Sequence, residues 1–182
     1  MYRAIVLRDH GSPDTLKLEK VDINKPKKGE LFLSQTAIGV HFHDIYVRTG
    51  LYKTLKLPGI PGVEAVGKIE EIGQGEKEFK VGDRVAYITS GYGAYSSHRI
   101  LKRELAIKIP DDITDELIAT NFSRALTVKM LLEEVANINS HKIILVTAAS
   151  GGVGRLLCQW ASFLNVTVVG LVSNKEKVEL AK

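Results

Sequence analysis

The sequence of 182 residues predicts an α/β protein whose N-terminal part is mainly β. Residues 1–126 contain short alternating or apolar runs separated by glycine and proline, a pattern typical of a small, largely antiparallel barrel. Residues 142–172 instead show a strand, a glycine turn, a helix and a second strand. That order is typical of one βαβ unit of a parallel sheet, for which about 30 residues is the usual length.

The composition excludes several function classes. It is ordinary for a soluble globular protein, with 45% hydrophobic and 25% charged residues, and the net charge of +4 is compatible with an anionic small ligand. The sequence has no basic stripe with interleaved aromatic residues, so binding to nucleic acid is not expected. No leader peptide opens the sequence and no run approaches the roughly 18 apolar residues of a membrane span, so we expect a cytoplasmic protein.

The single cysteine, Cys158, excludes an internal disulfide and a multi-thiolate zinc site. It lies between Leu157 and Trp160 in an expected helix, which predicts a buried and inert thiol.

Turn residues and apolar patterns define the elements of the N-terminal part. Strands are expected at residues 2–8, 16–21, 30–40, 64–72, 82–87 and 94–100, with turns at 10–13, 25–29 and 57–62. Thr114 is a plausible N-cap for a first helix. A longer helical pattern runs from Asn121 to Val135 and then leads through Asn137–Ser140 to the next strand. It carries a predicted apolar stripe made of Leu126, Met130, Leu131 and Val135. We expect this helix to join two domains, 1–125 and 126–182.

The βαβ unit predicts a nucleotide site. Lys142–Val146 reads as a parallel strand covered on both faces, residues 155–164 as a helix and 166–172 as a second strand. In the intervening turn, Gly151 would let the chain turn, Gly152 would let a ligand approach the backbone, and Gly154 would allow close packing. The helix N-terminus would then face a pyrophosphate.

The glycine spacing by itself is weak evidence for that site. It does not match the GxGxxG pattern, and Ala148 stands where a glycine could open the motif. The prediction therefore depends on the flanking strands, and an ordinary βα turn is the alternative.

The tip after the second strand favours NADPH over NADH. An NAD site places an acid there for the ribose 2′-hydroxyl, whereas Ser173–Lys177 offers a hydroxyl and two lysines that could hold a 2′-phosphate. Lys175 and Lys177 could instead begin a solvated helix. The sequence ends at 178–182 in a young helix after only two such strands. We therefore expect an incomplete nucleotide-binding domain in a chain that is poorly stable or self-associating.

Several segments together carry a family resemblance. They are Gly39–Tyr52, Leu57–Gly67, Gly82–Val85, Ala94–Ser97, Leu126–Thr127 and Ala148–Gly154. With these motifs the sequence resembles the quinone oxidoreductase (zeta-crystallin-like) branch of the medium-chain dehydrogenase/reductases. The resemblance implies a GroES-like catalytic domain, a Rossmann domain that binds NADP, an active cleft between them and a homodimer in full-length relatives. It also implies that a C-terminal part of a full-length member is missing.

Two departures bear on metal binding and on the site. Val63 stands where zinc alcohol dehydrogenases carry histidine, and no cysteine lies near residue 41, so we expect no metal. His41 stands where quinone reductases typically have asparagine. If the segment were extended, His41 and His43 would share a face beside Asp44 and could suggest a metal cluster. Without a third firm ligand, a cofactor-facing or structural role is favoured.

The resemblance also implies roles for single residues. The expected cofactor contacts are His41, Phe42, His43, Asp44, Tyr46 and Thr127 near the nicotinamide end, Gly151, Gly152, Val153 and Gly154 at the pyrophosphate, and Ser173, Asn174 and Lys177 near the 2′-phosphate. The expected catalytic residues are Tyr46, Arg48 and Tyr52, lining a quinone slot, and Thr127. Each tyrosine could instead be a half-buried residue of the barrel.

The resulting function hypothesis is a zinc-independent NADPH:quinone oxidoreductase. A variant of the same chemistry is an NADPH-dependent enone or alkene reductase. The alternative from another class is a non-catalytic remnant or nucleotide-binding module.

Overall fold

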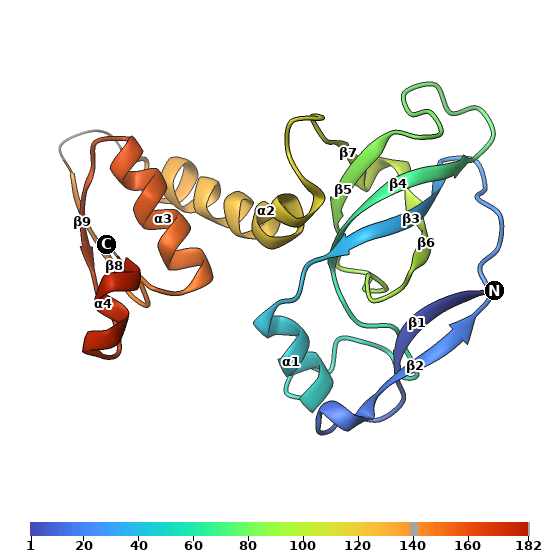
Figure 1. Ribbon diagram of the computed structural model, residues 1–182, viewed down its shortest axis with the longest axis horizontal. Helices are drawn as coiled ribbons and strands as arrows, with labels where there is room; N and C mark the ends of the chain where they lie inside the picture. Colours follow the sequence, from blue (N-terminus) through green and yellow to red (C-terminus); the bar gives the residue numbers. More distant parts are fainter. Residues whose placement is uncertain (139–141, 182) are drawn as a thin grey trace. The chain divides into compact units, whose positions relative to one another are not determined.

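The computed structural model describes residues 1–138 and 142–181 and divides the chain into two compact units, Met1–Thr120 and Asn121–Lys182 (Figure 1). The boundary lies inside helix α2 (Asp115–Lys129), as does the boundary expected after residue 125. The expected linker Asn137–Ser140 lies partly outside the described residues. Lys182, the last residue of the expected C-terminal helix, lies wholly outside them.

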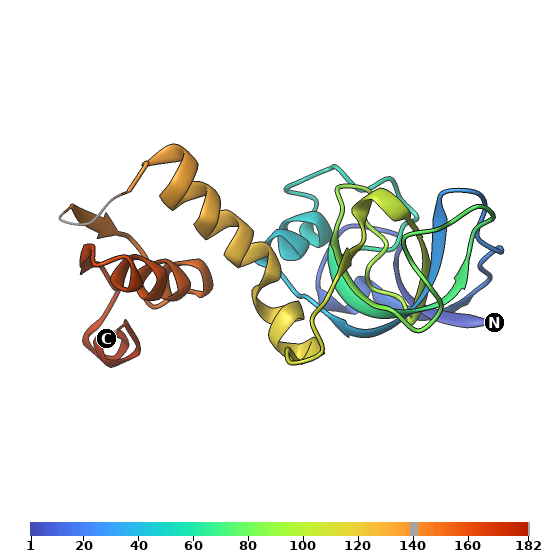
Figure 2. The same cartoon turned by 90° about the horizontal axis from the view of Figure 1, so that it is seen from above.

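The first unit is built on a five-stranded antiparallel sheet in the order β6-β3-β4-β5-β7 (Figures 1 and 2). Its strands are β3 (Glu30–Ile38), β4 (Glu64–Ile72), β5 (Arg84–Ile88), β6 (His98–Lys102) and β7 (Ile107–Lys108), with the 3₁₀ turn η2 (Arg103–Leu105) between the last two. Alternate residues of the strands point inward, as the period of two requires, and form the core. Its buried members are Leu31, Leu33, Ala65, Ile69, Phe79, Val85, Tyr87, Ala94 and Leu101. The expected sheet-rich N-terminal part is confirmed.

A separate hairpin packs on this unit. Strands β1 (Tyr2–Leu7) and β2 (Leu16–Val21) pair antiparallel around the 3₁₀ turn η1 (Pro13–Thr15). The amide of Ile5 donates to the carbonyl of Tyr95 at 2.8 Å, which ties the hairpin to the segment before β6.

The condition for placing His41 and His43 on one face is not met, because residues Phe42–Thr49 form helix α1 and are not extended. The carboxylate of Asp44 accepts a hydrogen bond from the amide of His41 at 2.9 Å and so caps the first turn. Gly50 ends the helix in the left-handed conformation, with φ of 81°. The expected strand 94–100 is also shorter than predicted, since β6 begins at His98.

The second unit is the βαβ element with flanking helices. Its elements are α2, whose last part lies in this unit, the π-helical turn η3 (Met130–Val135), β8 (Ile143–Val146), α3 (Gly152–Phe163), β9 (Thr167–Gly170), the 3₁₀ turn η4 (Lys175–Lys177) and α4 (Val178–Ala181). Strands β8 and β9 are parallel, with Ile143 opposite Thr167. Buried Val128 and Leu132 pack with Ala161 and Val166, so α2 and η3 share a core with α3.

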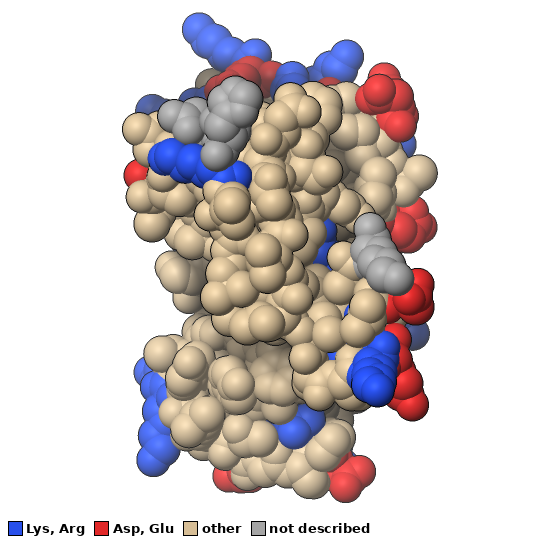
Figure 3. Space-filling view, turned by 90° about the vertical axis from the view of Figure 1, so that its left-hand side faces the viewer, with Lys and Arg blue, Asp and Glu red and all other residues tan. Residues whose placement is uncertain are grey.

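In this unit, the expectation of a strand covered on both faces is wrong, and the apolar stripe of the helix is not its buried face. The predicted apolar stripe is largely solvent-facing, with Val135 69% exposed, because the helix turns the face of Val128 and Leu132 to the core. Strand β8 is not covered on both faces, since Ile143 is 72% and Leu145 63% exposed. Figure 3 shows one face of the molecule on which uncharged side chains form a broad area, with the charged ones mostly at its margin. Within the described residues, β8 and β9 each pair on one side only.

Arg84 in β5 fixes the start of α2. Its guanidinium donates to Asp115 at 2.5 and 3.0 Å and to the carbonyls of Ile113 at 2.7 Å and Pro110 at 3.2 Å. Thr114 caps the helix as expected, its hydroxyl accepting from the amide of Leu117. Burial alone would raise the pKa of Asp115, but the bonds from Thr36 and Arg84 outweigh burial and hold that pKa below its usual value.

We expect Arg84→Met to lower the free energy of unfolding by about 1–2 kcal/mol at pH 7, since it removes charged hydrogen bonds at a half-exposed site. Because the pKa of Asp115 is lowered in the folded state, the difference from wild type should shrink as the pH falls below about 4. Urea unfolding at pH 7 and pH 3 measures both effects. Arg8→Met is the matched control, because the Arg8–Glu19 pair is more exposed. An equal loss in both variants would contradict the anchoring role.

The exposed strand residues predict self-association of the chain. Replacing both Ile143 and Leu145 by lysine should shift the protein towards monomer, because charges on an open strand face oppose pairing and apolar contact. Sedimentation velocity over a range of concentrations measures this. Leu18→Lys, at an exposed apolar position of the other unit, is the control. A wild-type chain that stays monomeric at every concentration would contradict the prediction.

Candidate functional site

The turn from β8 into α3 bends at Ala148, not at Gly151. Ala148 has φ of 51°, the left-handed conformation that glycine adopts at least cost, whereas Gly151 has φ of −78°. The sequence analysis assigned the turn to Gly151, and that assignment is wrong. Holding a non-glycine residue in this conformation costs about 1–2 kcal/mol, and such strain often accompanies a functional turn.

The other glycines of the turn have distinct steric reasons. A Cβ at Gly154 would lie 2.3 Å from the carbonyl oxygen of Ala148, so the helix could not approach the turn this closely with a larger residue. A Cβ at Gly152 would lie 2.8 Å from Nε of Arg124. The first contact involves the backbone and the second a long side chain from α2.

The N-terminus of α3 favours an anion. Its N-cap is Gly151, which has no side chain to cap the helix, and its first turn contains no acidic residue. The leading amides of a helix have no intrahelical acceptor and carry partial positive charge. Arg124 adds a full positive charge beside Gly152. The glycine turn gives no local sequence signal for Arg124, because Arg124 lies on a different helix.

A hollow of about 650 Å³ adjoins this turn. It is bounded by η3, β8, the turn and α3, and its lining includes Thr147, Ala148, Gly151, Val153 and Gly154. The remaining lining residues are mainly apolar. The structure therefore brings the predicted pyrophosphate residues together at the rim of an apolar hollow.

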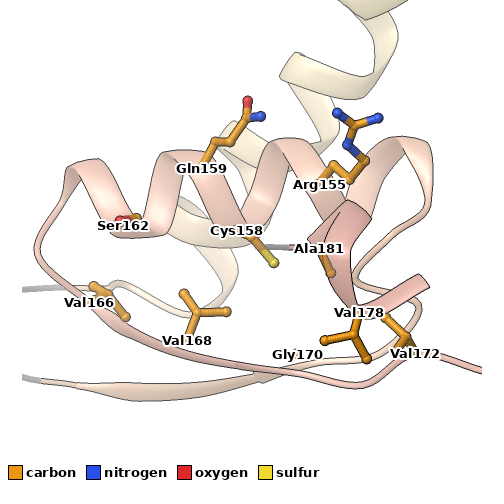
Figure 4. Close-up of a pocket in the computed structure, with 10 residues that line it drawn as sticks. All are labelled: Arg155, Cys158, Gln159, Ser162, Val166, Val168, Gly170, Val172, Val178 and Ala181. Atoms are coloured by element: carbon orange, nitrogen blue, oxygen red, sulfur yellow. The ribbon is translucent and has the colours of Figure 1, made fainter. Parts of the chain in front are cut away.

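A second hollow, of about 670 Å³, lies between α3, β9 and α4 (Figure 4). None of the predicted cofactor residues lines it. Cys158 lines it and is half-buried, so the expectation of a buried thiol is wrong. Burial still raises the pKa of the Cys158 thiol, which keeps it protonated and unreactive.

The predicted 2′-phosphate residues form an exposed tip. Asn174 caps η4, its side-chain oxygen accepting from the amide of Lys177 at 3.0 Å. The side chains of Ser173 and Lys177 are exposed. Thr127 lies elsewhere in the unit, on α2, and its hydroxyl donates to the carbonyl of Ser123 at 2.9 Å.

In the first unit, several buried or half-buried polar side chains lie around the start of α1. Nε2 of His41 lies 2.5 Å from Oε2 of Glu64, whose side chain is only 1% exposed. Asp44 is also buried, and its Oδ2 accepts from the amide of His41 and from the hydroxyl of Tyr95 at 2.8 Å. Burial, and then the negative charge of Asp44, raise the pKa of the Tyr95 phenol. In the described chain, Oδ1 of Asp44 has no hydrogen-bond partner.

Helix α1 and the segment after it form a cluster of rings, which we call the aromatic cluster. Its members are Phe42, His43, Tyr46, Tyr52 and Tyr92. The ring of Tyr46 lies 5.3 Å from that of Phe42 and 5.1 Å from that of Tyr52, and His43 lies 5.6 Å from Tyr52. Phe42 and Tyr52 are exposed, so the cluster offers apolar ring surface to a ligand.

Arg48 is not a member of the aromatic cluster. Its Nε donates to the carbonyl of Gly11 at 3.1 Å. The structure thus places the residues predicted around the nicotinamide and the quinone slot on or beside α1, with Thr127 in the other unit. Among the described residues, no group of three or more histidine, cysteine or acidic side chains is placed to hold a metal ion. In the same part of the chain, no helix has the length and apolar character to cross a membrane.

The match of one domain defines the class of protein. Residues 27–111 match the alcohol dehydrogenase GroES-like domain, which covers most of the five-stranded sheet. The chain is therefore related to the medium-chain dehydrogenase/reductase superfamily.

Within that superfamily, the resemblance to the quinone oxidoreductases is confirmed. All 182 residues align at 38% identity with quinone oxidoreductase of Pseudomonas aeruginosa, covering 56% of that protein. The crystal structure of Escherichia coli quinone oxidoreductase complexed with NADPH matches the chain with a TM-score of 0.93 at 37% identity. The match covers 98% of the present chain and 55% of the Escherichia coli chain. The 2-haloacrylate reductase of Burkholderia is 36% identical, with 56% of its length covered. The chain spans about half the length of these relatives.

We expect Gly154→Ala to destabilise the second unit by about 1–3 kcal/mol, because the new methyl group would meet the backbone of Ala148. Gly152→Ala is the matched control, since its methyl group would meet only the movable side chain of Arg124 and alanine favours a helix. Thermal unfolding followed by circular dichroism compares the two. Equal stability of both variants would contradict the packing role of Gly154.

Proposed function

We propose that this protein is a zinc-independent oxidoreductase that uses NADPH to reduce quinones. The observation that carries the proposal is the uncapped N-terminus of α3 with Arg124 beside it, in a chain similar throughout to quinone oxidoreductases. The relative from Escherichia coli has been solved with NADPH, which supports the choice of cofactor.

The residues present fit a dinucleotide phosphate. The amides of Gly152 and Val153 and the guanidinium of Arg124, which lies in the space that a side chain at Gly152 would fill, would hold the pyrophosphate. Ser173 and Lys177 would hold the 2′-phosphate, since both side chains are exposed and no acid repels it at the end of β9.

For the nicotinamide end, the proposed contacts in the first unit are the residues around α1, and the proposed contact in the second unit is Thr127. In the first unit, Oδ1 of Asp44 is buried and has no hydrogen-bond partner within the described chain.

The bound cofactor would supply the hydride, so the chain has to bind and orient the substrate. The exposed rings of Phe42 and Tyr52, with Tyr46 between them, suit a flat apolar ring such as a quinone. Val63 occupies the position at which zinc-dependent relatives carry a metal-binding histidine, which supports reduction without a metal.

An activated alkene is the second candidate substrate. The 36% identity to a 2-haloacrylate reductase favours it, because reduction of such a substrate uses the same hydride donor. Parallel turnover assays with a benzoquinone and a 2-haloacrylate distinguish the two.

A nucleotide-binding module without turnover is the alternative from another class. The open faces of β8 and β9 favour it, and saturable cofactor binding with no turnover of either substrate would identify it.

Calorimetric titration of the chain with NADPH and, separately, NADH tests the cofactor site. We expect saturable binding with a preference for NADPH. Arg124→Met should weaken binding of both cofactors about tenfold, or 1.4 kcal/mol, because both carry the pyrophosphate. Lys177→Met should weaken NADPH alone by a similar factor.

Lys129→Met is the control for these variants, since Lys129, the last residue of α2, pairs with Glu133 on η3. No binding of either cofactor, or a preference for NADH, would contradict the proposed site.

A further inference from the structure

We propose that His43 donates the proton that the reduced substrate needs, and that Tyr92 and Thr54 reload His43 from solvent. The inference rests on the proposed function and assigns the proton source of the same reaction. All of its residues belong to the first unit.

A chain of hydrogen bonds joins the three side chains. Nε2 of His43 lies 3.1 Å from the hydroxyl of Tyr92, and the same hydroxyl is hydrogen-bonded to the hydroxyl of Thr54. The rings of His43 and Tyr92 are stacked with centroids 6.0 Å apart, so packing holds the imidazole against its partner. Tyr92 is 7% exposed while Thr54 is exposed, so the path runs from solvent through a buried phenol to the imidazole.

The backbone of Tyr92 supports a functional role. Its φ is 57°, a left-handed conformation that is a genuine outlier for a bulky side chain. A glycine would suit the turn better, and glycines stand on both sides of it. Strain of this kind persists where the surroundings enforce it and is concentrated at functional sites. Here the strained residue carries the hydroxyl that joins His43 to Thr54.

The hydrogen bonds allow proton transfer from Thr54 through Tyr92 to His43 in one of the two neutral imidazole tautomers. A neutral imidazole has one donor and one acceptor nitrogen. When Nε2 accepts from Tyr92, Nδ1 carries the proton, and the described chain gives Nδ1 no acceptor. The imidazole also belongs to the aromatic cluster, with its centroid 5.6 Å from that of Tyr52. A flat substrate that rests on the exposed rings of this cluster therefore meets a proton donor.

The reaction balances with one proton from solvent. The quinone gains a hydride, which carries two electrons, from the dihydronicotinamide, which is oxidised. The remaining product oxyanion takes the proton from Nδ1 of His43 as that N–H bond breaks. Nε2 takes a proton from Tyr92, Tyr92 takes one from Thr54, and Thr54 takes one from water, which leaves the imidazole as the Nε2–H tautomer. The Nδ1–H form returns after product release, when Nδ1 takes a proton from water and Nε2 gives its proton back through Tyr92 and Thr54. For each hydroquinone formed, one hydride and one proton are consumed.

The kinetic test uses the full chain with NADPH and a benzoquinone. His43→Phe keeps an aromatic ring and should lower kcat at least 100-fold with KM changed less than about threefold. Thr54→Val should lower kcat by a smaller factor and change the solvent deuterium isotope effect, because it interrupts reloading. His98→Phe, at a histidine outside the cluster, should leave kcat unchanged. An unchanged kcat in His43→Phe would overturn the inference and leave the proposed function standing.

A second readout needs no turnover. In ¹⁵N NMR spectra, His43 should be the Nδ1–H tautomer, and Tyr92→Phe should abolish that preference. Titration with trimethylhydroquinone should shift the Nδ1 signal of His43 and leave that of His98 in place. If wild type shows no turnover, the proposed function fails, and this titration decides whether His43 meets the product oxygen. An unshifted Nδ1 signal, or the Nε2–H tautomer, would overturn the inference.

Discussion

The buried carboxylate of Asp44 fixes the geometry on which the substrate-facing part of the first unit depends. It accepts from the amide of His41 and from the hydroxyl of Tyr95, so it both starts α1 and ties that helix to the segment before β6. The helix start sets the direction of every side chain on α1, including those of Phe42, His43 and Tyr46. A buried carboxylate requires such partners, because an unpaired charge in the interior is costly.

In the second unit, close approach of backbone atoms has the same organising role. The contact between Gly154 and Ala148 brings α3 against the turn, and the amides at the start of the helix then lie at the rim of an apolar hollow. The charge of Arg124 reinforces the positive end of the helix. The proposed phosphate site is thus made mainly from main-chain atoms, which explains why glycines rather than charged residues dominate the local sequence.

Features with a local cause could be predicted from the sequence. Strand β4 was expected with its observed bounds, and Thr114 was expected as the cap of α2, because alternation and capping are read from neighbouring residues. Helix α1 was missed, since it has only a few turns and its capping depends on Asp44. Arg124, Glu64 and Tyr92 were also missed as site residues, because each meets its partner from a distant part of the sequence. The burial of β8 was overestimated, because an apolar run indicates that burial of a strand face would be favourable. It does not indicate whether another element packs on that face.

The boundary inside α2 has an evolutionary consequence. The residues assigned to substrate and proton lie before it, apart from Thr127, and those assigned to the phosphates of the cofactor lie after it. Substitutions in and around α1 or at Tyr92 can therefore change which electrophile is reduced without disturbing the preference for a phosphorylated ribose. Such a division allows one reductant to serve divergent chemistries. The relatives of similar identity include both a quinone oxidoreductase and a 2-haloacrylate reductase.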